Sequence, residues 1–224
     1  FQIIAAMQGG QSTCFIAIAG QEQFVLKVFS PAHGSNSRQG VLAEYQALEK
    51  VAGVAESHPN LMLPRPLALF EDQWAFLMTF VEGEDLDVFM DHRADLSQGI
   101  ETLAEGILSG LALFHDVLGG VFGDCHPGNF LVRSPLELSL IDATSSDPLV
   151  VELATRPSAM PMSVDLGYWT ATVALNISLE LRKEHRSPLN RLRLTWLLVE
   201  LGAQRIAPED VPGFRRDVYA VAHR

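Results

Sequence analysis

The sequence predicts an α+β fold in which a small antiparallel sheet comes first and helices dominate the rest of the chain. Short apolar runs separated by hairpin-like turns fill the first third, where one helix is expected, and long helical patterns follow. With 224 residues, 48% of them hydrophobic, the chain can bury a substantial core in one globular unit or in two small lobes. For two lobes, we expect the boundary between residues 1–82 and 83–224.

Composition narrows the class of protein. A net charge of −11 argues against general nucleic-acid binding. Cys14 and Cys125 lie far apart without metal-ligand spacing, so we expect reduced thiols and a cytoplasmic protein. The chain starts at Phe1 without a basic and apolar leader, which fits a processed chain or an excised domain. The long apolar segment 164–182 contains acidic and polar residues, so a buried helix explains it better than a membrane span.

Three strands are expected near the start, at residues 1–6, 14–19 and 24–29. The turn between the first two offers backbone N–H groups and hydroxyls that could cover a phosphate, although a plain hairpin turn would look similar. The groups in question belong to Gly9, Gly10, Ser12 and Thr13.

Lys27 stands inside the otherwise apolar third strand. A lysine there is costly to bury unless it is paired, so it either meets a carboxylate and a ligand or lies on an edge strand facing solvent. The helix expected at about 41–51 carries two candidate partners, Glu44 and Glu49.

Two further strands, 67–70 and 74–80, lead into an acidic stretch. Residues 82–105 contain eight acidic residues and only one arginine. This excess of negative charge indicates either a solvated helix face or a surface that favours a cationic partner. These acids are Glu82, Glu84, Asp85, Asp87, Asp91, Asp95, Glu101 and Glu105. Helices are expected at 99–118, 164–182 and 188–201, with a short one after Pro212.

The segment 121–132 reads Val-Phe-Gly-Asp-Cys-His-Pro-Gly-Asn-Phe-Leu-Val, and Leu-Ile-Asp follows at 140–142. Two short strands joined by a turn would hold Asp124, Asn129 and Asp142 around one point. An Asp that accepts a hydroxyl proton, with an Asn and a second Asp that share hard cations, is what phosphoryl transfer from Mg-ATP requires.

This motif resembles the protein-kinase-like superfamily. The pattern Gly-Asp-x-His-Pro-Gly-Asn-x-Leu-Val is most similar to the branch that holds aminoglycoside and choline phosphotransferases, with lipopolysaccharide kinases as relatives. The resemblance implies a two-lobed fold: a small antiparallel-sheet N-lobe with one helix, and a shortened, mostly helical C-lobe. It also implies ATP and Mg²⁺ as cofactors.

The resemblance implies a role for each matched residue. Lys27 holds the nucleotide phosphates and is placed by Glu44, and the backbone of the hinge reads adenine. Asp124 orients the acceptor hydroxyl and takes its proton. Asn129 and Asp142 hold Mg²⁺. The remaining matches are Thr79 and Val81 at the hinge, Asp85 or Asp87 at the ribose, and Asp165 as a brace for the catalytic-loop backbone.

The chain also departs from regulated protein kinases. Phe122 replaces the usual His, Gly123 replaces the Arg that grips a phosphorylated activation loop, and Ala143 follows Asp142 where Phe is usual. We therefore expect a kinase for a hydroxyl of a small molecule or glycan, active without prior phosphorylation. The alternative is a minimal protein kinase or an AMP-transferring enzyme that modifies a protein. A non-catalytic pseudokinase is the third and least favoured reading.

Overall fold

The computed structural model of the chain describes residues 2–8, 12–30, 36–55, 61–92, 96, 99–133, 137–142, 160–180 and 188–223. Its contacts form two compact units. The first comprises Phe1–His58 with Leu63–Glu82, and the second comprises Pro59–Met62 with Gly83–Arg224.

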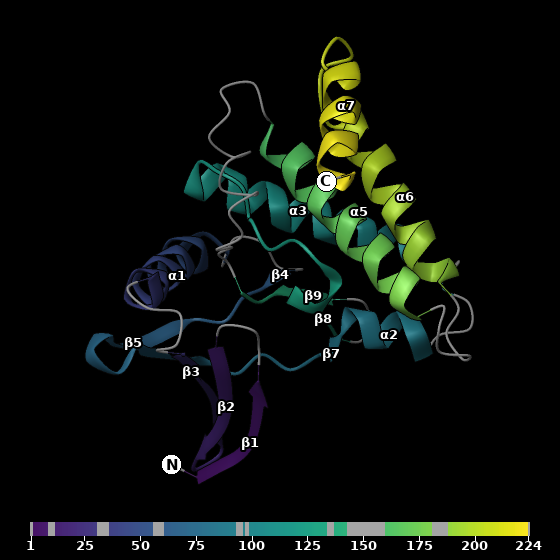
Figure 1. The fold of residues 1–224 in the computed structure, drawn as a ribbon. Helices are drawn as coiled ribbons and strands as arrows, with labels where there is room; N and C mark the ends of the chain where they lie inside the picture. The colour runs from purple at the N-terminus through teal and green to yellow at the C-terminus, as the bar shows by residue number, and fades with distance from the viewer. Residues whose placement is uncertain are drawn as a thin grey trace. The chain divides into compact units, whose positions relative to one another are not determined.

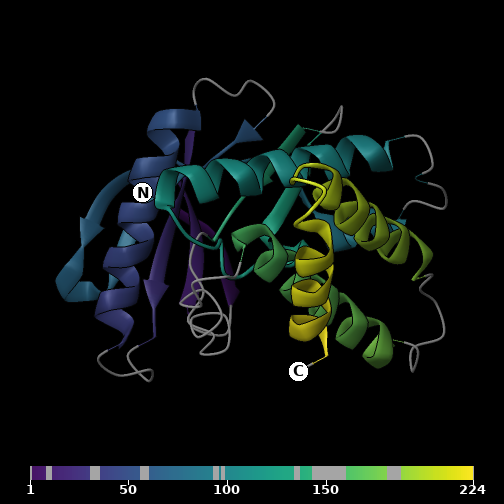
Figure 2. The ribbon, with the colours of Figure 1, turned by 90° about the horizontal axis from the view of Figure 1, so that it is seen from above.

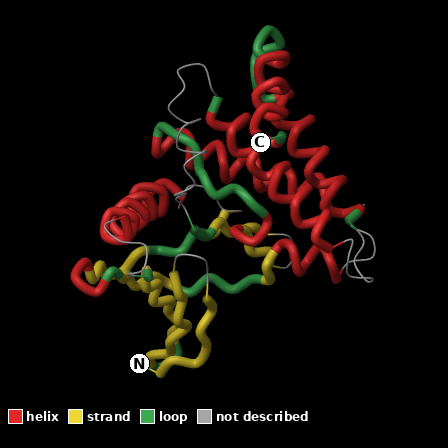
Figure 3. Tube along the Cα trace, in the orientation of Figure 1, coloured by secondary structure: helices red, strands yellow, loops and turns green. Residues whose placement is uncertain are grey.

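The first unit is built on a five-stranded antiparallel sheet in the order β1-β2-β3-β6-β5 (Figures 1 and 3). Hairpin neighbours β1, β2 and β3 pair in sequence order, as the short turns predict. The strands are β1 (Gln2–Gln8), β2 (Ser12–Ala19), β3 (Glu22–Phe29), β5 (Pro66–Phe70) and β6 (Ala75–Thr79), with the 3-10 turn η2 (Glu71–Gln73) before β6.

Helix α1 (Asn36–Ala55) packs against β3, β5 and β6 of this sheet. It is longer than the expected helix at 41–51, and its buried residues recur at the three- and four-residue spacing of one helix face. These residues are Val41, Glu44, Leu48 and Val51. The alternation of burial along β3 places Val25, Lys27 and Phe29 on one buried face.

The second unit combines a small sheet with helices (Figures 1 and 2). Its strand order is β4-β9-β8-β7, where β4 is Leu61–Met62, β7 is Glu84–Asp85, β8 is Phe130–Arg133 and β9 is Glu137–Leu140. The helices are α2 (Leu86–His92), α3 (Ile100–Leu118), α5 (Pro161–Glu180), α6 (Leu189–Gln204) and α7 (Val211–Ala222), and the 3-10 turn η3 is Pro127–Asn129.

Helix α3 forms the core of this unit, because its apolar stripe is almost completely buried. It ends at Gly119, whose φ of 69° is the left-handed conformation that glycine adopts without strain. The expected buried helix, α5, is buried only in part: Val164 and Trp169 are in the core, whereas Leu175 and Leu179 near its end are exposed. No helix in the described part of the chain is long and apolar enough to span a membrane.

Candidate active site

The hairpin of β8 and β9 brings the ends of the central motif together. Phe130 pairs with Leu140 across the two strands, and the N–H of Ile141 donates to the carbonyl of Asn129 over 2.9 Å. Asn129 and Asp142 therefore lie next to each other at one end of the hairpin, as the sequence predicts.

The loop before this hairpin folds around the backbone of Asp124. The N–H of His126 and the side-chain amide of Asn129 both donate to the Asp124 carbonyl, over 3.0 and 2.8 Å. Pro127 then opens the 3-10 turn that leads into β8. The Asp124 side chain keeps 30% of its surface exposed, so a substrate can reach it.

Two residues of this segment have positive φ. Gly123 has a φ of 94°, where any side chain would strain the backbone, so an arginine fits poorly at this position. Asp142 has a φ of 72°, which aspartate tolerates better than most residues. Strain of this kind persists only where the surroundings enforce it, and it clusters at functional sites.

A buried carboxylate from α5 holds the loop before Asp124 by its backbone. Asp165, with no exposed surface, accepts the N–H groups of Phe122 and Gly123 over 2.8 and 2.9 Å. His115 of α3 contacts the same carboxylate, with 2.6 Å between Nε2 and Oδ2. The resemblance implied the Asp165 brace, but no local pattern in the sequence links it to His115.

Phe122 fills the position where the related motif has His. It is 1% exposed and packs edge-on against Phe114, with ring centroids 5.0 Å apart. Phe130 continues this aromatic cluster toward Trp169. The aromatic replacement thus anchors the loop by packing.

His126 lies beside the Asp124 carboxylate, with 3.6 Å between its Nε2 and Oδ1 of Asp124. Burial alone would raise the pKa of Asp124, but the hydrogen bond and charge of His126, together with Asn129 and Tyr168, lower it. Tyr168 went unnoticed in the sequence, where it reads as one more apolar helix position.

His126 is also held within its own loop. Its Nδ1 accepts the N–H of Gly128 over 3.1 Å, so in the neutral ring the proton is assigned to Nε2, which faces Asp124. Burial would lower the pKa of His126, but Asp124, with the charges of Asp87 and Asp142, raises it above 6.5.

The predicted metal ligands are an amide oxygen and a carboxylate, a donor pair that suits Mg²⁺. No cluster of three or more His, Cys, Asp or Glu side chains that could hold a metal occurs among the described residues. Mg²⁺ sites in phosphotransferases need no such cluster, because substrate phosphates and water complete the octahedron. Asn129 and Asp142 therefore fit a nucleotide-bound Mg²⁺ better than a resident structural ion.

In the first unit, Lys27 and Glu44 form a buried ion pair. The Lys27 ammonium lies 2.8 and 3.0 Å from the two carboxylate oxygens, with residue exposures of 3% and 1%. The alternative of a solvent-facing edge lysine is therefore wrong. Glu49, the other candidate partner, is exposed and interacts with Tyr45 instead. The Lys27 ammonium also lies 5.3 Å from the Phe29 ring centroid.

The structure describes only some of the other residues that the sequence predicts to bind nucleotide. Gly9 and Gly10 lie outside the described residues. Ser12 and Thr13 begin β2, opposite Phe29 and Val28. At the expected hinge, Thr79 is already used: its N–H donates to Arg65 and its hydroxyl accepts from Arg65. The N–H of Phe80 donates to the Gln23 carbonyl. The N–H groups of Thr79 and Phe80 are therefore already paired within the first unit.

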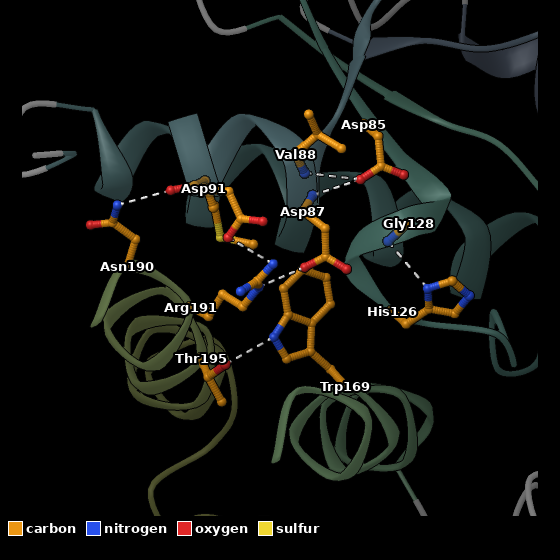
Figure 4. A network of polar contacts seen from close by, with 11 residues as sticks. Asp85, Asp87, Val88, Asp91, His126, Gly128, Trp169, Asn190, Arg191 and Thr195 are labelled. Atoms are coloured by element: carbon orange, nitrogen blue, oxygen red, sulfur yellow. Dashed lines mark hydrogen bonds and ion pairs between the residues drawn. The ribbon is translucent and has the colours of Figure 1, made fainter. Parts of the chain in front are cut away.

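Half of the acids in the acidic stretch pair with basic side chains of the second unit, which the charge count alone did not anticipate. Arg191 of α6, 2% exposed, lies 2.9 Å from both Asp87 and Asp91 of α2 (Figure 4). Asp85 caps the same helix by accepting the N–H groups of Asp87 and Val88. Two other acids of the stretch contact His92 and Arg205: these are Glu84 and Glu105. Asp95 lies outside the described residues.

Comparisons with known proteins identify the fold. No family model and no curated protein matches the sequence. Among solved structures, the chain is similar to the Rv3197–erythromycin complex from Mycobacterium tuberculosis, with 16% identity, a TM-score of 0.49, and 81% of this chain and 52% of that chain covered. It is also similar to Rad53 1–466 in complex with AMP-PNP, with 22% identity and a TM-score of 0.53, covering 78% and 46%.

The chain thus spans about half the length of these two solved structures. The likeness to Rad53, a protein kinase, shows that the chain has the protein-kinase-like fold, as its motif predicts. At these sequence identities the comparisons show the fold alone.

Proposed function

We propose that this protein is an ATP-dependent phosphotransferase that moves the γ-phosphate to a hydroxyl of a small molecule or glycan. The observation that carries the proposal is the packing of Asp124, Asn129 and Asp142 at one hairpin. The buried Lys27–Glu44 pair supports the proposal. Burying both charges costs desolvation energy and adds little to stability, so a role in binding ligand explains the pair better than a role in folding.

In this proposal Lys27 holds the phosphates of ATP, and Glu44 keeps its ammonium oriented. Hydroxyls of Ser12 and Thr13, with backbone N–H groups of Gly9 and Gly10, would contribute hydrogen bonds to phosphate oxygens. The backbone of Val81 would read the adenine edge. Mg²⁺, held by Asn129 and Asp142, would neutralise charge on the transferred group.

Asp124 would orient the acceptor hydroxyl and receive its proton. A carboxylate whose pKa is lowered by its neighbours is a weak base but stays ionised, so it can always accept the hydroxyl hydrogen bond. This suits phosphoryl transfer, where the transition state is loose and positioning contributes most of the rate.

Two features favour a small acceptor over the alternative of a protein-modifying enzyme. Gly123 adopts a backbone conformation unsuited to the arginine that phosphorylation-dependent kinases use, so activity should need no prior phosphorylation. The sequence between Asp142 and α5 also contains no Ala-Pro-Glu motif, which regulated protein kinases carry there. Transfer of AMP instead of phosphate is distinguished by the mass of the product.

The charge of the acceptor would depend on acids that have no basic partner. Asp87 and Asp91 share Arg191, so one positive charge offsets part of their contribution to an acidic field. A cationic acceptor would depend on exposed acids such as Glu82 and Glu101. If it does, kcat/KM falls as ionic strength rises, and Glu101→Gln weakens that dependence more than Asp91→Asn would.

The test is ATP turnover with panels of amino sugars, glycans, simple alcohols and proteins, with products read by mass. We expect one acceptor to gain a phosphoryl group, and Asp124→Asn to reduce transfer by roughly a thousandfold while changing ATP affinity only a few-fold. Asp116→Asn, an exposed site on α3, is the matched control. Near-normal transfer by the Asp124→Asn variant would sink the assignment.

A further inference from the structure

We propose that Asp87 of α2 is a specificity-determining residue, which accepts a hydrogen bond from a second hydroxyl of the acceptor, beside the hydroxyl that reacts. The inference rests on the proposed function and deepens it, because it selects sugars and other polyols over alcohols with one hydroxyl. It begins from a carboxylate that a buried arginine holds by one oxygen.

One oxygen of the Asp87 carboxylate is already bonded. Nε of Arg191, a residue that is 2% exposed, donates to Oδ1 over 2.9 Å. Within the described part of the chain, no other side chain donates to this carboxylate. In Figure 4 the second oxygen points away from Arg191, to the side where His126 and Gly128 lie. The Asp87 side chain is 26% exposed, so a ligand can reach the carboxylate.

Three contacts place the start of α2 beside the loop that contains Asp124. Strand β7, which leads into α2, pairs with β8. Oδ1 of Asp85 accepts the N–H of Asp87 over 2.8 Å, and its Oδ2 lies 3.5 Å from the position that a Cβ on Gly128 would take. Helix α2 also packs against η3, which follows His126. Asp87 therefore lies on the side of α2 that adjoins the Asp124 loop.

The charge balance around Arg191 favours a donor from a ligand. The guanidinium also lies 2.9 Å from Asp91, so two carboxylates share one positive charge. Asp91 is the more enclosed of the two, with 9% of its side chain exposed. The excess negative charge is therefore met at Asp87, by water or by a donor on a ligand. Because Arg191 offsets part of the charge, a neutral hydroxyl suffices as that donor.

The decisive pair of variants is Asp87→Asn and Asp91→Asn. Since Arg191 carries only donors, the amide in Asp87→Asn turns its oxygen to Arg191 and presents NH₂ in place of the free carboxylate oxygen. We expect kcat/KM for the acceptor found in the panel to fall roughly 10-fold, the scale of one hydrogen bond to a charged group, and KM for ATP to stay within about twofold. Asp91→Asn weakens a contact to the same arginine but should leave both constants near wild type.

Deoxy analogues of that acceptor complete a double-mutant cycle. Loss of the second hydroxyl should lower kcat/KM of wild type roughly 10-fold, but that of Asp87→Asn by less than about twofold. Equal losses in the two proteins, or equal effects of Asp87→Asn and Asp91→Asn, would overturn the role of Asp87. Wild-type transfer to simple alcohols as efficient as transfer to polyols would also overturn it. In each of these cases the phosphotransferase assignment would stand.

A measurement on the free protein tests the placement of Asp87 without activity. Burial would lower the pKa of His126, but Asp124, with the charges of Asp87 and Asp142, raises it. In NMR titrations of the His126 ring protons, Asp87→Asn should therefore lower this pKa, and Asp91→Asn should change it less. If Asp87→Asn leaves the pKa unchanged, Asp87 does not face the loop and the inference fails. If wild-type protein transfers phosphate to no acceptor, the proposed function fails and this inference fails with it.

Discussion

At the scale of single residues, the candidate site is specified by a few side chains whose surroundings decide their chemistry. Asp124 and His126 modify each other: the pKa of the carboxylate is lowered and that of the imidazole is raised. Asp142 occupies the left-handed backbone region. Two predictions follow from these local features.

The first concerns the metal. Asp142→Ala should abolish the Mg²⁺ dependence of nucleotide binding, because a hard cation loses its only carboxylate in the proposed ligand pair. Titration of a fluorescent ATP analogue with and without Mg²⁺ measures this. Asp116→Ala should behave like wild type. A variant at position 142 that retains the wild-type response would place the metal elsewhere.

The second concerns pH. Because the folded-state pKa of His126 is raised above 6.5, its pairing with Asp124 stabilises the fold below that pH and is lost as pH rises through the folded pKa. Asp124, with a lowered pKa, contributes above 3.8 and loses that contribution as pH falls. The pair is therefore strongest between these limits.

Urea unfolding of wild type and His126→Gln in Mg²⁺-free buffer tests the direction in which the pair's contribution to stability changes with pH. The stability difference should be largest between about pH 4 and 6.5 and shrink toward pH 8.5. His92→Gln, at an exposed site on α2, is the control. A difference that grows with rising pH would contradict the assigned shifts.

At the scale of elements, α2 is held in place by charges from another helix. The Arg191 guanidinium contacts Asp87 and Asp91, and the amide of Asn190 donates to the Met90 carbonyl over 3.1 Å (Figure 4). Helix α6 is tied in turn to α5, where Trp169 donates to Thr195 over 3.1 Å. Side chains from two consecutive turns of α6 thus join α2 to the helix that braces the catalytic loop.

Removing the positive charge of Arg191 should lower the unfolding free energy. Arg191→Met leaves two carboxylates facing an apolar side chain, so we expect a loss of roughly 3–5 kcal/mol in unfolding free energy. The triple variant that adds Asp87→Asn and Asp91→Asn should recover most of it. Arg215→Met, at an exposed pair with Glu200, should cost under about 1 kcal/mol. Equal effects at both arginines would refute the distinction.

At the scale of the whole molecule, the machinery is divided between two units with separate cores. The first unit contains the buried Lys27–Glu44 pair, and the second contains the catalytic loop with its brace. If the proposed function is right, ATP with Mg²⁺ binds the folded protein and must stabilise it by mass action.

We expect Mg-ATP at about 100 times its Kd to raise the unfolding free energy by about 2.7 kcal/mol. The double variant Lys27→Met, Glu44→Leu removes both buried charges together, so it should fold with near-native stability but gain little from ATP. Lys27→Met alone should be destabilised because Glu44 remains buried. If the double variant gains as much from ATP as wild type, Lys27 is not a nucleotide ligand.

Short-range sequence patterns predicted three features of the fold. These are the order of strands and helices, the β8–β9 hairpin and the burial of Lys27. Alternation along β3 assigns Lys27 to the buried face, and the spacing from Asp124 to Asn129 is set by one turn and one strand. Glu44 was expected as the partner of Lys27 from its place in the family's helix, and only the structure excluded Glu49.

Only the tertiary structure decided which distant charges meet. Arg191 pairs with Asp87 across 104 positions, and His115 reaches Asp165 across 50. The rotation of one helix against another determines such contacts, and no periodicity within either segment records it. For the same reason the sequence indicated an open charged surface for the acidic stretch, although half of its acids are paired.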